Sequence, residues 1–402
     1  MNETRATRYQ RLRRRAHAAG LASAGLMLTI VALTPLSRQL VVVAERFARG
    51  LPSPFFAAVT VGVFVVLVVA LWELAALPSA VYLARRIDLR YGAGHTATSV
   101  EDAMVAQAHA ALVALPVALI AGAIWLVSVR VAGAAWWVIA GALAAVAIGV
   151  GVRAGPALLA LVADATPLGK PALADRLRIL ARRAGVPVTS IEEWRVGDDA
   201  SSTALVAGIG RSRRVLIATP LLRDWSDDEL AVVVAHELAH HANGDLGRAA
   251  IVDAGVVVVA LGLAHLAVIA AAPWIQVSGP GDLAAVPLLV LIAGTIWIAA
   301  TPLRHALSRR DERRADTYAL ALTGAADAFT AAIRRLGERH LAEERPSAVT
   351  RMLYYRHPSV AERLALAAAY RRVTGSGAVI GDSRSRDQAM AEHRAIARSR
   401  QG

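Results

Sequence analysis

Residues 226–241 of this 402-residue chain, SDDELAVVVAHELAHH, combine a helix start with two histidines that share one helix face. Ser226, with Glu229 three residues later, forms a capping-box pattern, which predicts that a helix begins here. Within that helix His236 and His240 are four residues apart. Their imidazoles therefore lie on the same face, where each can give one nitrogen to a single zinc ion.

Other acidic residues complete this pattern. Glu237 directly follows the first histidine and is placed to take a proton from water rather than to bind the metal. A catalytic zinc site needs a third protein ligand, and the stretch SRRDERRADTYA offers Glu312. Asp316 follows one helical turn later and could orient a ligating histidine, whereas the neighbouring Asp311 is a rival ligand. The chain has no cysteine, so one zinc ion held by His and carboxylate is expected.

Composition indicates a membrane protein. Hydrophobic residues make up 56% of the chain and charged residues only 19%, which excludes a disordered chain and disfavours an ordinary soluble enzyme. Six apolar segments each approach the roughly 20 residues that span a bilayer as a helix. We therefore expect a mainly α polytopic membrane protein with about six transmembrane helices and a cytoplasmic α+β portion around the zinc helix. The six segments cover residues 18–34, 55–81, 104–128, 132–152, 249–272 and 283–302.

The arginines orient these spans. The formal net charge is +13, and a cluster of arginines in residues 5–15 precedes the first span, which predicts a cytoplasmic N-terminus. Six spans return the C-terminus to the same side. No zinc-finger, helix-turn-helix or aromatic-basic motif accompanies the charge, so a nucleic-acid partner is disfavoured. Of the 44 basic residues, the predicted outer loops contain Arg38, Arg46, Arg49 and Arg130.

Patterning divides the chain into five parts. Between the membrane regions, PALADRLRILARRAG predicts an amphipathic helix, and the runs SIEEWRV, TALVAGI and RVLIA predict a small sheet. The parts are a four-helix membrane region (1–152), a cytoplasmic sheet with the zinc helix (153–248), a transmembrane helix pair (249–302), a helical region with the third ligand (303–375) and a mobile tail (376–402).

Three motifs carry a family resemblance. HELAH, the distal SRRDERRAD and the later HPSVAER resemble the zinc metalloproteases that include the type-I CAAX prenyl proteases and the HtpX-like membrane proteases. The upstream TPLGKPALADRLRILARRAGVP is similar to the CAAX branch, whereas HANGD after the second histidine is closer to the HtpX-like pattern. The resemblance implies that His236, His240 and Glu312 are the zinc ligands, that Glu237 is the general base, and that Asp316 supports a ligand.

The resemblance also implies roles around the substrate. His357 and Arg363 match the family's HPxxxxR motif near the scissile carbonyl, where His357 could donate a hydrogen bond to the developing oxyanion; alternatively it only precedes Pro358 at a helix start. Thr203 and Ala204 stand where the family often has Asn-Ala on the strand that binds substrate. A threonine lacks the paired donor and acceptor of an amide, so substrate specificity is not transferred.

These patterns together predict a zinc-dependent endopeptidase in the cell membrane of a bacterium, with its active site and both termini in the cytoplasm. Its expected partners are a peptide or membrane-protein substrate and the lipid bilayer. Quality control of membrane proteins is the expected role. Cleavage of CAAX prenyl-peptides is the enzymatic alternative, and a non-catalytic membrane scaffold that retains the fold is the alternative of another class.

Overall fold

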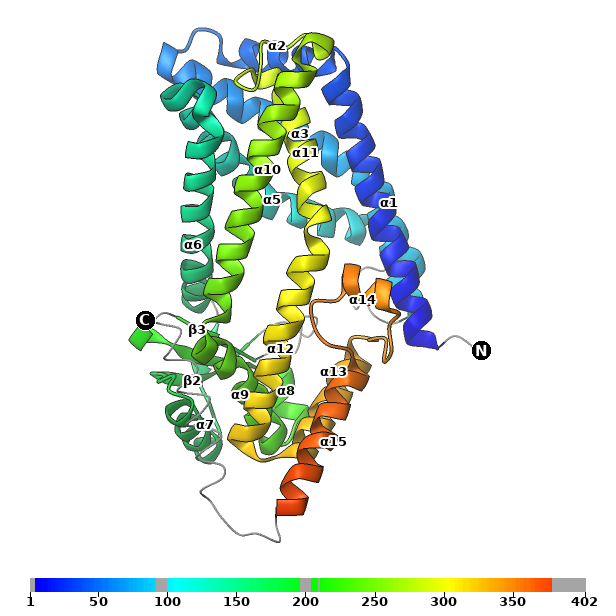
Figure 1. Ribbon diagram of the computed structural model, residues 1–402, viewed down its shortest axis with the longest axis vertical. Helices are drawn as coiled ribbons and strands as arrows, with labels where there is room; N and C mark the ends of the chain where they lie inside the picture. The colour runs from blue at the N-terminus through cyan, green and yellow to red at the C-terminus, as the bar shows by residue number, and fades with distance from the viewer. Residues whose placement is uncertain (1–3, 92–99, 163, 196–203, 209, 378–402) are drawn as a thin grey trace. The chain divides into compact units, whose positions relative to one another are not determined.

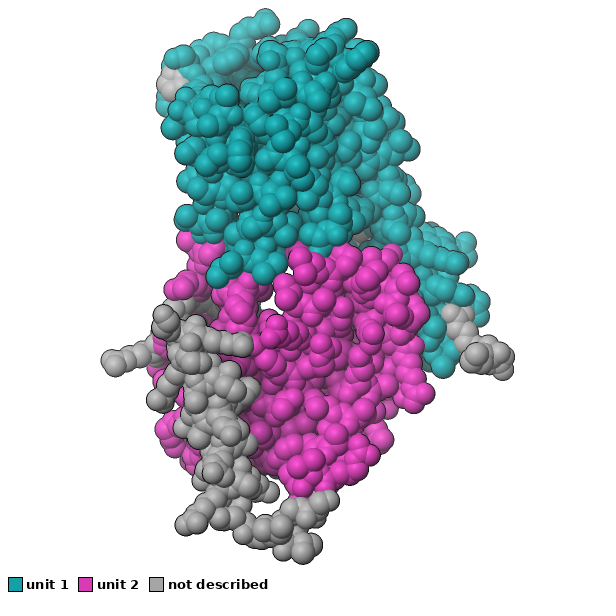
Figure 2. All heavy atoms as spheres, viewed as in Figure 1, with its two compact units in different colours: residues 1–148, 250–301 teal, residues 149–249, 302–402 magenta. Residues whose placement is uncertain are grey.

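The computed structural model describes residues 4–91, 100–162, 164–195, 204–208 and 210–377. The chain forms two compact units, and each unit is assembled from two separate stretches of sequence (Figure 2). Unit 1 comprises residues 1–148 and 250–301, and unit 2 comprises 149–249 and 302–402. The predicted mobile tail lies outside the described residues from residue 378 onward.

The described part of unit 1 is helical (Figure 1). Helix α3 packs against α1, α2 and α5, and α1 also packs against α11. Helices α6 and α10 each continue from one unit into the other. The elements are α1 (Arg5–Leu33), α2 (Leu36–Ala48), α3 (Ser53–Tyr82), a π-helical turn (Leu83–Asp88), α4 (Leu89–Tyr91), α5 (Val100–Ala132), a 3-10 turn (Gly133–Ala135), α6 (Trp136–Val162), α10 (Asp245–Ile275), a 3-10 turn (Leu283–Ala285) and α11 (Val286–Ala299).

Membrane-spanning helices account for the apolar composition. Among the described residues, four helical segments are long and apolar enough to cross a bilayer, and a fifth is added if a bent helix pair counts as one span. This confirms the predicted class, a mainly helical polytopic membrane protein with a small sheet. The segments are Arg5–Leu33, Phe55–Asp88, Met104–Gly155 and Asp245–Ile275, with the pair Leu283–Ala299 and Thr301–Thr323 bent by 44°.

The predicted number of six spans depends on one of these segments. Met104–Gly155 is 52 residues long, which at 1.5 Å per residue is more than twice the roughly 30 Å of a bilayer core. The 3-10 turn at Gly133–Ala135 interrupts it, and Gly133 has a φ of 50°. The sequence analysis placed two spans within this segment. Counted as a single span, the segment gives four or five membrane spans for the described residues. The number six therefore stays a prediction.

Helix α2 was not predicted, because its arginines were assigned to an outer loop. Its apolar residues recur at helical spacing, and Val41 and Ala44 are buried against Phe64 of α3. Polar contacts fix its first turn: Ser37 Oγ donates to Ala284 O at 2.7 Å, and Arg38 pairs with Asp282 at 2.9 Å. These contacts hold α2 against the turn that precedes α11.

Unit 2 combines a sheet with helices. The predicted amphipathic helix, the three predicted strands and the capping box at Ser226 are all confirmed, whereas the short strand β1 was not predicted. The elements are β1 (Ala165–Pro167), α7 (Pro171–Arg183), β2 (Ser190–Trp194), β3 (Ala204–Ala207), a 3-10 turn (Gly210–Ser212), β4 (Arg214–Ala218), α8 (Thr219–Asp224), α9 (Asp227–Asn243), α12 (Thr301–Thr323), α13 (Ala326–Arg339), α14 (Ala348–Tyr354) and α15 (Val360–Gly377).

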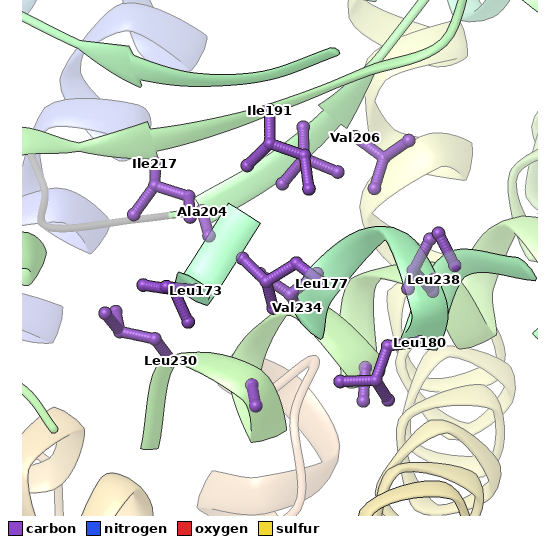
Figure 3. Close-up of a cluster of buried hydrophobic side chains, with 14 of the residues drawn as sticks. Leu173, Leu177, Leu180, Ile191, Ala204, Val206, Ile217, Leu230, Val234 and Leu238 are labelled. Carbon is purple, nitrogen blue, oxygen red and sulfur yellow. The ribbon is translucent and has the colours of Figure 1, made fainter. Parts of the chain in front are cut away.

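The sheet has the order β1-β2-β4-β3, with β2 and β4 parallel and the outer pairs antiparallel, so β3 is an edge strand. Helices α7 and α9 cover the sheet through an apolar core (Figure 3). Leu177 of α7 and Leu238 of α9 are fully buried there, and Val206 of β3 packs into the same cluster. Because burying one leucine contributes about 1.5–3 kcal/mol, this core fixes the zinc helix against the edge strand.

A tight turn separates β3 from β4, and its glycines differ in how much space surrounds them. Gly208 has a φ of 96°, and a Cβ added there would lie 2.4 Å from Ser212 O. Gly210 has a φ of 57°, and a Cβ there would meet nothing within 4 Å.

We therefore expect Gly208→Ala to lower the free energy of unfolding by about 2 kcal/mol or more. The alanine would adopt a strained left-handed backbone conformation, and its Cβ would also clash with the backbone of Ser212. Gly210→Ala, the matched control, should cost only the strain of about 1 kcal/mol. Thermal unfolding of the detergent-purified variants measures both. Equal losses would contradict the geometry of this turn.

Candidate metal centre

Helix α9 places His236 and His240 on one face. Its N-terminus is fixed by the capping box, in which Ser226 Oγ accepts from Glu229 N at 3.3 Å and Glu229 Oε2 accepts from Ser226 N at 2.8 Å. Leu238 and Ala239, which lie between the histidines, are buried. The two imidazoles turn to the other side of the helix, and their Nε2 atoms are 3.2 Å apart.

Helix α12 brings Glu312 to these nitrogens. Its Oε2 lies 3.2 Å from His236 Nε2, and its Oε1 lies 3.6 Å from His240 Nε2. The three ligand atoms all lie within 4.8 Å of one another. Two imidazole nitrogens and one carboxylate oxygen are a donor set that catalytic zinc sites use, so the residues present fit a zinc ion.

A buried carboxylate supports the first histidine. Asp316 is fully buried, and its Oδ1 lies 2.9 Å from His236 Nδ1. Arg363 of α15 donates to both carboxylate oxygens of Asp316, with Nε 2.8 Å from Oδ2. Since Nδ1 of His236 is engaged by this carboxylate, Nε2 is left to face the metal position. The guanidinium balances the buried charge.

A second carboxylate supports the other histidine in the same way, and this one was not predicted. His240 Nδ1 lies 2.8 Å from Oδ2 of Asp245, which is buried at the start of α10. Two arginines balance its charge: Arg314 Nη2 donates to Asp245 Oδ1 at 2.7 Å, and Arg248 bonds to the same oxygen. Asp245 ends the HANGD stretch, which the sequence analysis quoted for the resemblance without giving the aspartate a role.

Asp311 does not belong to the metal-binding group among the described residues. Its Oδ1 lies 3.2 Å from both Arg248 Nη2 and Arg314 Nη2. The rival ligand of the sequence analysis is therefore part of the arginine network behind His240. Glu312, one residue later on α12, faces the imidazoles instead.

Glu237 and His357 flank the ligands. Burial raises the pKa of Glu237 above its usual value, although His236 and His240 oppose this. His357 lies just before α15, and its Nδ1 is 2.9 Å from Glu312 Oε2, while its side chain is 63% exposed. It therefore contacts a ligand and is also open to solvent.

The pocket stabilises positive charge. Burial alone would lower the pKa of His236, but hydrogen bonds with Asp316 and Glu312 outweigh burial and raise it to about 10. Without a metal this imidazole is thus protonated at neutral pH between two carboxylates. A bound cation would replace that proton, and this is the electrostatic setting that a metal site requires.

The predicted substrate residues have different positions. Thr203 lies outside the described residues. Ala204 is in β3, and its methyl group is buried in the core, so only its backbone could face a substrate. Arg363 was also predicted to bind substrate, but its guanidinium is engaged by Asp316. That role stays a prediction, whereas the contact with Asp316 is a finding.

His241 has a contact that the sequence analysis did not identify. Its Nε2 lies 3.1 Å from Val206 O of the edge strand β3. A carbonyl oxygen only accepts, so Nε2 carries the proton. Burial lowers the pKa of His241, which favours the neutral form. The residue after the second histidine thus links α9 to the backbone of β3.

Comparison with known proteins identifies the family. The family model Peptidase family M48 matches residues 167–371, about half of the chain. The Uncharacterized metalloprotease YhfN of Bacillus subtilis (strain 168) is 28% identical over 209 residues, which cover 50% of this chain and 48% of YhfN. The chain thus spans about half the length of that relative. Protease HtpX of Xanthomonas campestris pv. campestris (strain B100) is 29% identical over 210 residues, covering 48% of this chain and 70% of HtpX.

A solved structure shares the fold over most of the chain. The crystal structure of S. mikatae Ste24p matches with a TM-score of 0.74 and 18% sequence identity, covering 90% of this chain and 88% of Ste24p. The resemblance drawn from HELAH, SRRDERRAD and HPSVAER is thereby confirmed. The chain belongs to Peptidase family M48.

Proposed function

We propose that the chain is a membrane-embedded, zinc-dependent endopeptidase whose site faces the cytoplasm. The observation that carries this proposal is the group of His236, His240 and Glu312 beside Glu237. Each imidazole of the group is supported by its own buried carboxylate. A protein that served only as a scaffold would not need ligands fixed in one tautomer or a base next to them.

In the proposed mechanism His236, His240 and Glu312 hold one zinc ion. When bound, zinc supplies Lewis-acid polarisation of the scissile carbonyl and makes water more acidic. Glu237 takes the proton from the attacking water and passes it to the leaving amine. Its pKa is raised by burial, which suits a group that first accepts and then donates a proton.

The remaining roles concern substrate. A peptide can add to the edge strand β3 as an extended strand, since this edge lies beside α9 in the fold. His357 reaches Glu312 from an exposed position and could donate to the developing oxyanion. Asp316 keeps Arg363 occupied, so we assign Arg363 to positioning rather than to direct substrate contact.

The cytoplasmic assignment and the role in quality control rest on the distribution of arginines and on the HtpX-like pattern. Cleavage of prenylated peptides is the main alternative, and the stretch TPLGKPALADRLRILARRAGVP, which is similar to the CAAX branch, favours it. One assay separates the two: purified protein is given a farnesylated CaaX peptide or a misfolded membrane protein, each with and without chelator. Chelator-sensitive cleavage of the misfolded protein alone supports quality control, and cleavage of the farnesylated peptide alone supports the alternative.

We expect Glu237→Gln to retain zinc and to lower kcat/KM by about 10²–10⁴-fold, because it removes the proton acceptor and keeps the shape of the side chain. Glu338→Gln, at an exposed residue of α13, is the matched control and should leave both unchanged. Zinc content is measured by elemental analysis and kcat/KM with a cleaved peptide. Undiminished, chelator-sensitive cleavage by Glu237→Gln would refute the assignment.

Asp245→Asn should weaken zinc binding by about 10–100-fold, since the carboxylate that fixes His240 is lost. Asp227→Asn is the control, because Asp227 is half exposed and its ion pair among the described residues is with Lys170 at 3.4 Å. Competition with a zinc-sensitive dye measures the affinity. Equal zinc affinity of the two variants would show that Asp245 does not support the ligand.

His241→Phe should raise KM about fivefold with unchanged zinc content, because one hydrogen bond that aligns β3 with α9 is lost. His241→Gln, which can still donate to Val206 O, should restore part of the loss. Steady-state kinetics separates KM from kcat. A change in kcat without a change in KM would argue against a role in aligning the strand.

A further inference from the structure

Helix α14 exposes large apolar side chains. Val349, Met352, Leu353 and Tyr354 are 62%, 42%, 38% and 50% exposed, although α14 has only seven residues. A short helix in contact with water is expected to bury its large apolar side chains. An exposed group of such side chains therefore indicates a surface that contacts another molecule or a membrane. The metal site uses none of these four residues.

Hydrogen bonds hold α14 against α12. Arg309 Nη1 of α12 donates to Arg351 O at 3.0 Å and to Tyr355 O at 2.7 Å, and His305 is hydrogen-bonded to the backbone of Met352. Helix α12 begins at Thr301, directly after the apolar helix α11 and Ala300. Arg309 is eight residues further along, which is about 12 Å at the helical rise. The contact at Arg309 therefore lies about two helical turns after the start of α12, where the apolar segment of the chain ends.

The surroundings of α14 are basic. Arg345 and Arg356 flank it with no acidic residue between them in the sequence, whereas Arg351 within it is paired with Glu362 at 2.6 Å. On α12, Arg304 and Arg309 are electrostatic neighbours of His305, as is Arg356. Apolar side chains bordered by arginines are the pattern of a helix that lies in the interface of an anionic bilayer.

We infer that α14 lies in the headgroup layer of the membrane, with its four exposed apolar side chains inserted among the lipids and the neighbouring arginines against anionic phospholipid headgroups. Because α14 is bonded to the first turns of α12, which directly follow an apolar segment in the chain, the bilayer is the apolar phase that we assign to it, and the basic border matches the charge of its surface. A peptide substrate or another part of the chain would be a different occupant of this surface.

The contact bears on the metal site. Tyr355 follows α14 directly, and its Oη donates to the buried carboxylate of Glu343 at 2.8 Å. Two residues later His357 contacts Glu312. A lipid-bound α14 thus fixes one end of the short segment that carries His357. This consequence rests on the proposed function, whereas the lipid contact itself does not.

The absence of cysteine from the chain makes the inference directly testable. Val349→Cys and Met352→Cys, each labelled with an environment-sensitive dye, are placed in nanodiscs of phosphatidylcholine and phosphatidylglycerol with or without spin-labelled lipid. Ile179→Cys on α7, at an apolar residue of similar exposure, is the matched control. We expect several-fold stronger quenching at 349 and 352 than at 179, and stronger quenching by a shallow spin label than by a deep one.

Quenching at 349 and 352 no stronger than at 179 would overturn the inference. An apolar environment reported by the dye without quenching would also overturn it, because protein rather than lipid would then cover α14. Adding Arg356→Gln to Met352→Cys should reduce the membrane-bound fraction of α14 up to about fivefold in discs with phosphatidylglycerol, and much less in pure phosphatidylcholine. No reduction would overturn the assignment of anionic lipid. Zinc content and cleavage are measured separately, so failure here is distinguishable from failure of the proposed function.

Discussion

The arrangement of unit 2 depends on two hydrogen-bonded chains of side chains. In each chain an arginine holds a buried carboxylate, and the carboxylate holds an imidazole. His236 is fixed by Asp316 with Arg363, and His240 is fixed by Asp245 with two arginines. Burying an unpaired carboxylate would be strongly unfavourable, and the guanidinium groups offset that cost. Both imidazoles are thereby oriented with Nε2 toward Glu312.

This arrangement requires the consecutive helices α9 and α10 to meet two elements that are distant in sequence. Helix α9 brings the histidines, α12 brings Glu312 and Asp316, the first residue of α10 brings Asp245, and α15 brings Arg363. Apolar packing holds them in place: Leu238 and Ala319 share one core, while Val232, Leu320 and Phe329 share another. Phe329 also lies 5.8 Å from the guanidinium of Arg363, so the core and the ionic network position the same residue.

The segment between α13 and α15 connects the site to its surroundings. Its helix α14 exposes apolar side chains next to arginines, and its end carries His357 to Glu312. The edge strand β3 is linked to α9 by the hydrogen bond from His241 to Val206 O.

The sequence by itself determined the local features. Regular spacing and a capping box predict helix α9, hydrophobic runs of sufficient length predict the membrane class, and the motif with Glu312 predicts the group that could hold a metal, because each depends on neighbouring residues or on a short pattern. Tertiary structure alone decided the partners across the chain. Asp245 supports His240, Asp311 pairs with arginines instead of joining the predicted ligands, Arg363 is engaged by Asp316, and α2 forms a helix where a loop was predicted. These outcomes depend on which side chains the packed core brings within a few ångströms of one another, and sequence spacing does not encode those distances.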